Sequence, residues 1–366
     1  GYGIIIVRLI MFVYNLNFGG VLKYFVFPFL VLVTLTSISF NCSENTLDST
    51  DLLPPGRRDY LWTVDTLFIP FTVLQRIWGS SPTDVWAIGP GGDADKTIYH
   101  FDGTGWKNDG ISRPLAPTSI WGSAPDNIWI GSGGGDIWRF DGVNWLKNST
   151  LILEGYNYIS LENIWGDSPD NVYVVGFAEN TETFTSIIAK FDGNQWKLMD
   201  ATKNSNSFIK IKRGIKTSNN YFVMGLRIEQ FYADTSYLYE FDGSNLNLIY
   251  QGFANNDELG EFEVINNEMI FLRGYEICKY SGNKFQAIYT ITNPNFDNGM
   301  WGRNLNDLFF SMKNGIAHYN GSNLEYIYNF EEGIRLTGGM IFEDEVFFLA
   351  YDYNNGLNLV FRGKLK

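Results

Sequence analysis

The fold is decided by a segment that occurs three times, first as Ile77-Trp78-Gly79-Ser80-Ser81-Pro82-Thr83-Asp84-Val85-Trp86. Further copies occupy residues 120–129 and 164–173, and a degenerate copy occupies residues 300–309. Proline pre-sets φ, and Asp or Asn hydrogen-bonds its own backbone, so the centre of each copy predicts a tight turn. The β-branched and aromatic residues beside the turn favour strands. Each copy therefore predicts strand, turn and strand.

A second marker, Phe-Asp-Gly, alternates with the first. It begins at Phe101, Phe140, Phe191 and Phe241, with degenerate copies at Tyr280, Tyr319 and Phe361. Asp-Gly is a strong hairpin signal, and a large apolar residue follows five positions after the aromatic in six copies. In the seventh copy that position is Lys366. Seven units of four short strands, here called A to D, predict an all-β, seven-bladed β-propeller over residues 57–366.

The seventh unit ends before a strand D. Residues 60–67, which precede the first unit, are apolar and β-branched and belong to no unit of their own. We expect them to form strand D of blade seven, because such closure removes an exposed sheet edge. Arg57 and Arg58 would then lie just outside that strand.

Strand C alternates between polar and apolar side chains. The position before the aromatic holds His100 in one unit and His318 in another, where other units have Arg, Lys or Glu. This pattern predicts that both histidines are surface residues. Cys278 occupies the alternate, apolar position, which predicts an inert core thiol.

Composition limits the function classes. The chain has 366 residues, a net charge of −13, 2 His and 2 Cys. The acidic balance argues against nucleic-acid binding, since phosphates must be met by an excess of Lys and Arg. Two cysteines exclude a disulfide-stapled scaffold and a Cys-rich zinc site. Two histidines leave little for His-based catalysis.

The first 42 residues form an export segment. Lys23 precedes an apolar run from residue 24 to residue 38, which is shorter than the ~20 residues of a membrane-spanning helix. Residues 39–42 follow the run and end at Cys42, which predicts a bacterial lipoprotein signal with Cys42 as the lipidation site; the alternative is a plain signal peptide or anchor. Residues 43–56 predict a flexible linker. Because the chain starts with Gly, residues 1–20 are possible overrun from a reading frame assigned too far upstream.

The Ile-Trp-Gly and Phe-Asp-Gly repeats, together with Arg57-Arg58-Asp59-Tyr60, resemble those of exported propeller lipoproteins of the Bacteroidetes–Chlorobi–Ignavibacteria group. The resemblance covers residues 57–366. It implies an exported protein in the outer membrane or periplasm, attached to the membrane by a lipid. It implies nothing about the ligand.

The B–C and D–A connections vary in length and composition, whereas the A–B and C–D turns are short and repetitive. Variable loops on a rigid scaffold usually carry binding, so we expect ligands on the face formed by the B–C and D–A connections. This face is called the variable face below. The candidate ligand-binding residues on its loops are Asp93, Asp95, Asp136, Phe177, Tyr232 and Asp234. Arg76, Arg213 and Arg335, near strand A, are candidates for an anion site.

Cofactors are not expected. Asp93 and Asp95 offer oxygen ligands for Ca²⁺, but the segment lacks the spacing of a calcium loop, which favours a solvated turn.

Two functions remain open. The first is a monomeric, surface-tethered, non-enzymatic propeller that binds a protein or a glycan. The alternative is a carbohydrate-active hydrolase that uses carboxylates at the mouth of the central channel.

Overall fold

The computed structural model describes residues 54–69, 71–200, 209–217, 220–229, 232–253, 259–281 and 284–366, without the side chains of 228, 229 and 232–234. The described residues belong to one compact unit, Leu53–Lys366. The expected export segment with Cys42, and residues 43–53 of the expected linker, lie outside the described residues.

The described residues form seven four-stranded antiparallel sheets. Blade one contains β2 (Arg76–Ser81), β3 (Asp84–Ile88), β4 (Ile98–Phe101) and β5 (Trp106–Lys107). Blade two contains β6 (Pro117–Ala124), β7 (Asn127–Ser132), β8 (Asp136–Phe140) and β9 (Trp145–Thr150), with a short 3₁₀ turn, η2 (Gly133–Gly135), between β7 and β8. Blade three contains β10 (Tyr158–Ser168), β11 (Asn171–Glu179), β12 (Phe184–Phe191) and β13 (Trp196–Leu198).

The later blades follow the same order. Blade four contains β14 (Ile209–Lys216), β15 (Tyr221–Glu229), β16 (Tyr232–Phe241) and β17 (Leu246–Phe253). Blade five contains β18 (Leu259–Ile265), β19 (Glu268–Arg273), β20 (Glu276–Ser281) and β21 (Lys284–Thr290). Blade six contains β22 (Phe296–Asn304), β23 (Asp307–Met312), β24 (Gly315–Tyr319) and β25 (Leu324–Asn329).

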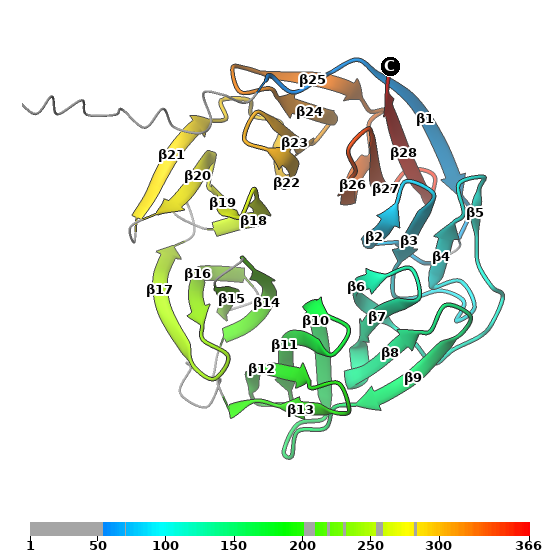
Figure 1. The fold of residues 1–366 in the computed structure, drawn as a ribbon, viewed down its shortest axis with the longest axis vertical. Coiled ribbons are helices and arrows are strands. Elements are labelled where there is room, and N and C mark those ends of the chain that lie inside the picture. The colour runs from blue at the N-terminus through cyan, green and yellow to red at the C-terminus, as the bar shows by residue number, and fades with distance from the viewer. Residues whose placement is uncertain are drawn as a thin grey trace, which may run out of the picture. The chain divides into compact units, whose positions relative to one another are not determined.

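Blade seven joins the two ends of the described chain. It consists of β26 (Ile334–Ile341), β27 (Glu345–Asp352), β28 (Leu357–Leu365) and β1 (Tyr60–Leu67). β1 pairs with β28 along its whole length, from Tyr60 opposite Leu365 to Leu67 opposite Asn358. Figure 1 shows the seven blades arranged in a ring, with the first strand of each sheet nearest the centre. The predicted seven-bladed propeller and its closure by an N-terminal strand are confirmed.

Each blade is buried on both faces by its two neighbours. The core divides into seven clusters of buried residues, one between each pair of adjacent blades. In β3, for example, Val85 belongs to the cluster shared with blade seven and Trp86 to the cluster shared with blade two. Alternate side chains of a strand therefore enter different interfaces rather than a core and a solvent face.

This arrangement corrects the prediction for the histidines. The side chain of His318 is 0% exposed, and that of His100 is 34% exposed. In six blades the side chain at the polar position of strand C is paired with Asp84 of β3 or with the equivalent residue. In blade three the residue at this position, Lys190, instead lies over the ring of Tyr173. The pairs are His100–Asp84, Arg139–Asn127, Glu240–Asn220, Lys279–Glu268, His318–Asp307 and Arg362–Glu345.

The seventh repeat is offset from its expected register by two residues. Gly363, not Phe361, occupies the place that Phe101 has in blade one, because Phe347 pairs with Arg362 as Trp86 pairs with His100. Trp62 in β1 lies opposite Gly363, as Trp106 lies opposite Phe101. Trp62 therefore fills the large apolar position that the repeat pattern assigned to Lys366.

The other core prediction holds. Cys278 is fully buried in the cluster between blades four and five, and burial raises the pKa of its thiol to about 11. A thiol held protonated in this way is unreactive at neutral pH.

The Trp-Gly pair of the repeat is an inter-blade contact. A Cβ atom on Gly122 would lie 2.5 Å from the Cη2 atom of Trp78, in the preceding blade, and Gly166 is covered by Trp121 in the same way. Blades four and seven have no Trp-Gly pair of their own, yet Gly214 and Gly339 lie under Trp165 and Trp301 of the preceding blades. By strand register, Gly214 and Gly339 lie two positions before the place of the repeat glycine, which Lys216 and Ile341 occupy. A glycine nevertheless lies under the tryptophan wherever the preceding blade supplies one.

We predict that Gly122→Ala destabilises the fold by about 1–3 kcal/mol, because the added methyl group overpacks the interface against Trp78. The control is Gly105→Ala, since a Cβ there meets no atom within 4 Å. Chemical denaturation would measure both variants. Equal stability of Gly122→Ala and Gly105→Ala would contradict the packing argument.

Candidate functional site

A cavity of about 560 Å³ lies in the middle of the ring, lined by residues from all seven inner strands. Most of the lining residues come from the first half or the centre of these strands; the others are Gln75, just before β2, and Met224 and Leu226 of β15. Each inner strand follows a D–A connection, so this part of the strand lies toward the variable face. We therefore treat the cavity and the variable face as the candidate site.

The inner strands are irregular at the cavity. Register shifts interrupt the pairing of six of them with their neighbours, between Ser160 and Asn163 and between Ile211 and Arg213, for example. The other four shifts affect β6, β18, β22 and β26. Such bulges leave a residue outside the ladder and re-aim side chains. In this protein they carry Glu162 and Lys212, which line the cavity.

Of the described residues that line the cavity, three are basic and three are acidic. Lys212 pairs with Glu162 at 3.0 Å. Arg213 donates to Glu261 through one terminal nitrogen and to Glu263, at 2.5 Å, through the other. The guanidinium of Arg213 thus lies between two carboxylates. The remaining charge is Arg76.

The pKa values of these groups reflect burial and charge pairing. Burial raises the pKa of Glu263, and the charge of Glu261 adds to that effect against the opposing influence of Arg213. Burial acts to lower the pKa of Arg213, but Glu263 and Glu261 outweigh it and raise that pKa. For Glu162, burial is outweighed by Lys212 and Ser160, which lower its pKa.

The three candidate arginines have different positions. Arg213 and Arg76 line the cavity, whereas Arg335 does not. The guanidinium of Arg335 instead donates to the backbone carbonyls of Lys313 and Ile334. The structure therefore places two of the three candidate arginines, Arg76 and Arg213, in the same cavity.

The acidic candidates on the loops have partners. Asp93 accepts a bond from Lys96 at 2.9 Å. Asp136 begins β8 and is bound by Lys147 at 2.8 Å and by the hydroxyl of Thr150 at 2.7 Å. Asp95 lies in the loop between β3 and β4. Among the described residues, no group of three or more His, Cys, Asp or Glu side chains is placed to hold a metal ion.

The aromatic candidates fall in strands rather than in long loops. β11 extends to Glu179 and β12 begins at Phe184, so the connection between them is only residues 180–183. Phe177 lies inside β11 and is 7% exposed, with the Lys210 ammonium 3.9 Å from its ring centre. It is therefore not an exposed binding ring. The backbones of Tyr232 and Asp234 belong to β16, and their side chains lie outside the described residues.

The sequence patterns did not single out the exposed apolar residues of the variable face. Of the fourteen large hydrophobic residues that are exposed among the described residues, eight lie in B–C or D–A connections or at the adjoining strand ends. Only Val143 lies on the opposite face, and the other five are on outer strands. The eight are Phe68, Phe71, Ile111, Ile152, Tyr158, Phe253, Tyr275 and Tyr353. Concentration of apolar surface on one face is typical of a docking surface.

Phe71 is the most exposed of them, at 91%. Its φ of 61° is in the left-handed region, which a bulky residue rarely adopts. The residues that follow it are fixed by the fully buried Asn358 of β28, which donates to the carbonyl of Thr72 at 2.9 Å and accepts from the amide of Leu74 at 2.8 Å. The fold thus holds an aromatic ring in solvent on a restrained backbone.

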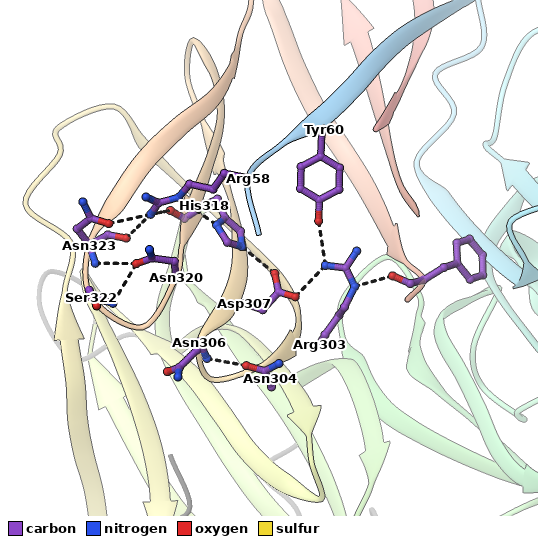
Figure 2. Close-up of polar contacts among 11 residues, drawn as sticks. Arg58, Tyr60, Arg303, Asn304, Asn306, Asp307, His318, Asn320, Ser322 and Asn323 are labelled. Carbon is purple, nitrogen blue, oxygen red and sulfur yellow. Dashed lines mark hydrogen bonds and ion pairs between the residues drawn. The ribbon is translucent and has the colours of Figure 1, made fainter. Parts of the chain in front are cut away.

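A polar network fastens the N-terminal segment to blade six (Figure 2). Arg58 donates to the carbonyls of His318 and Asn323 at 2.9 and 2.6 Å, and its Nε atom donates to Nδ1 of His318 at 3.3 Å. Arg303 donates to the hydroxyl of Tyr60 at 3.0 Å and to Asp307 at 2.8 Å. We call Arg58, Tyr60, Arg303, Asp307 and His318 the clasp. Arg58 lies just outside β1, as predicted, and from there it contacts blade six.

The His318–Asp307 pair resembles a catalytic dyad, but neither ring nitrogen of His318 is free to act on a substrate. Because Nδ1 accepts from Arg58, the proton of the ring is on Nε2, which donates to Asp307 at 2.7 Å. Both nitrogens are occupied and the side chain is 0% exposed. The pair is structural: it connects the closing strand to the ring.

Comparisons with known proteins agree with this fold. No family model matches the chain, and no curated protein matches it. Many solved structures do, among them YCF48 bound to a D1 peptide, at 13% identity, a TM-score of 0.60, and coverage of 86% of this chain and 100% of the other. A catalytically inactive virginiamycin B lyase from Staphylococcus aureus with quinupristin has 12% identity, a TM-score of 0.60, and coverage of 84% and 100%. The WD40 β-propeller domain of Doa1 has 10% identity, a TM-score of 0.57, and coverage of 82% and 96%.

The chain is thus a seven-bladed β-propeller, and at these identities the likeness extends to the fold alone. A search of the described residues for membrane-spanning helices finds no helix of sufficient length and apolar character.

We predict that the clasp makes the protein less stable in mild acid. Burial lowers the pKa of His318 from its ordinary 6.5, against the opposing effect of Asp307, so between pH 6.5 and that lowered pKa the unfolded chain binds more protons than the folded one. The contribution of His318 is therefore complete above pH 6.5 and is lost as the pH falls through the lowered value. Asp307, whose pKa is also lowered by its partners, titrates only below 3.8.

Urea denaturation between pH 7 and pH 5 measures this effect. We expect the free energy of unfolding to fall with pH in the wild type and to depend less on pH in His318→Gln. His100→Gln removes the histidine of the equivalent position in blade one and should keep the wild-type slope. An identical pH dependence in wild type and His318→Gln would rule out the clasp as its origin.

Proposed function

We propose that this protein is an exported, lipid-anchored β-propeller that binds a protein partner through its variable face and performs no catalysis. The observation that supports this most is the distribution of exposed apolar residues, eight on the variable face and one on the opposite face. Aromatic residues exposed on a rigid framework are frequent anchors of protein interfaces. The peptide in the YCF48 complex is consistent with this use of a propeller.

A glycan-active hydrolase is the second candidate. It is supported by the glutamates in the cavity, since burial raises the pKa of Glu263 and a second carboxylate, Glu261, is bound to the same arginine. However, a glycosidase needs free space between its two carboxylates for the bond to be cleaved. In this protein the guanidinium of Arg213 binds both carboxylates. Binding without catalysis is therefore the better supported function.

We predict that Phe71→Ala weakens partner binding by about 2 kcal/mol or more, as expected of an aromatic anchor, while leaving stability unchanged, since the ring is exposed. The matched control is Val143→Ala, on the opposite face. A photo-crosslinking amino acid at position 71 should capture a discrete protein in host cells, and one at position 143 should not. Equal capture at both positions, or at neither, would contradict binding through the variable face.

The proposed lipid anchor at Cys42 can be tested separately. If Cys42 is lipidated, cells fed a palmitate analogue should label the wild-type protein, and Cys42→Ala should abolish the label. The protein should then be recovered with the outer-membrane fraction or from the periplasmic side of the envelope. Secretion of unlabelled wild-type protein would show that the leader is a plain signal peptide.

A further inference from the structure

Arg76 differs from the other cations of the cavity. Lys212 and Arg213 are each bound to glutamate, but Arg76 has no carboxylate within ion-pair distance among the residues that the structure describes. Its one hydrogen bond is to the backbone carbonyl of Gln75, at 3.2 Å. Arg76 is exposed to the interior of the cavity. A guanidinium has five N–H donors, so most of those on Arg76 are available to a ligand.

The charges of the cavity are therefore distributed unevenly around the ring. On the wall formed by blades four and five, Arg213 faces two carboxylates, which leaves an excess of one negative charge. Glu162 and Lys212 cancel one another. Arg76 on blade one supplies the balancing positive charge without touching either carboxylate. Although the Arg76 side chain is exposed to the cavity, desolvation by the surrounding protein lowers its pKa; the charges of Glu162 and Glu261 oppose that effect and the charge of Arg213 adds to it, all through space.

We propose that Arg76 is the receptor for a carboxylate of a polypeptide partner, either an acidic side chain or a C-terminus, that enters the cavity from the variable face. Carboxylate is the group that the planar fork of arginine binds best, through two parallel hydrogen bonds. This inference rests on the proposed function and names the chemistry that the site recognises.

The cavity favours a polypeptide over an acidic sugar. Sugar rings are usually held against a free aromatic face, and the one aromatic residue among the described residues that line the cavity, Trp301, is packed against Gly339 and against Phe348 at 5.5 Å. The bulged inner strands, in contrast, interrupt the backbone ladder around the cavity. Bulged residues lie outside the ladder, and an extended peptide binds through main-chain hydrogen bonds of the kind that a ladder otherwise uses.

The test uses the mature propeller and an immobilised library of random octapeptides in three forms. One form has all carboxylates free, the second has an amidated C-terminus, and the third is amidated and has Asn and Gln in place of Asp and Glu. Oligosaccharides of uronic acids are spotted beside them. The proteins compared are the wild type, Arg76→Gln, and Arg335→Gln as the matched control, since Arg335 is the second residue of the neighbouring inner strand, β26, but does not line the cavity. Equal melting temperatures would show that all three are folded.

We expect wild type and Arg335→Gln to bind peptides with free carboxylates and to bind the uncharged form about 10- to 100-fold more weakly, the range for hydrogen bonds to charged groups. Arg76→Gln should lose the preference. Equal binding by wild type and Arg76→Gln, binding to no peptide, or Arg76-dependent binding to uronic acids alone would each overturn the proposal. Weaker peptide binding by Phe71→Ala with the preference for free carboxylates intact would separate this site from the proposed docking surface. Peptide binding that is unchanged in Arg76→Gln but is lost in Phe71→Ala would overturn this proposal and leave the proposed function standing.

Discussion

Burial of both faces of every blade is the constraint on which the rest of the structure depends. Each sheet has an apolar cluster on either side, and a blade at the end of an open row would leave one of them in water. Only a closed ring supplies seven interfaces to seven blades. Closure here relies on the pairing of β1 with β28, so residues at the two ends of the described chain complete one sheet. The clasp adds polar contacts from Arg58 and Tyr60 to blade six at the same place.

The same constraint explains the polar residues. A polar side chain between two blades needs a hydrogen-bonding partner, since burial without one is costly. In five blades that partner is the first residue of the second strand, and in blade four it is Asn220, the residue just before that strand. The polar side chain also stacks on an aromatic ring in places, as His100 does on Trp86 at 4.1 Å. His318 is the most enclosed member of the set because Gly56 and Arg58 lie over it. What resembles a catalytic histidine is thus a structural repeat position with an additional cover.

The repeats predict the blade number, the strand order and closure by Tyr60–Leu67, because all three follow from the turn residues of each repeat and from the spacing between repeats. Three features depend on contacts distant in sequence. The covering of His318 comes from a residue 260 positions away. In blade seven the large apolar position is filled by Trp62, which lies opposite Gly363. No repeat motif lies next to Trp62 in the sequence to indicate this register. The difference among Arg76, Arg213 and Arg335 lies in their partners, since glutamates reach Arg213 and backbone carbonyls hold Arg335.

The cavity charges nevertheless have a sequence signal. The residue before the isoleucine of Ile-Trp-Gly, or its equivalent, is Arg76 in blade one, Arg213 in blade four and Glu261 in blade five, and it is Ser119 and Asn163 in blades two and three. A position that serves the blade would carry the same residue type around the ring, as the buried Val85 and Val172 do. In blades six and seven the residues equivalent to Arg76 are Gly299 and Gly338. The position changes sign and size from blade to blade and lines the cavity in every blade except blade six, so it is free of the packing constraint. Its charges are therefore the part of the inner strand most open to selection for a ligand.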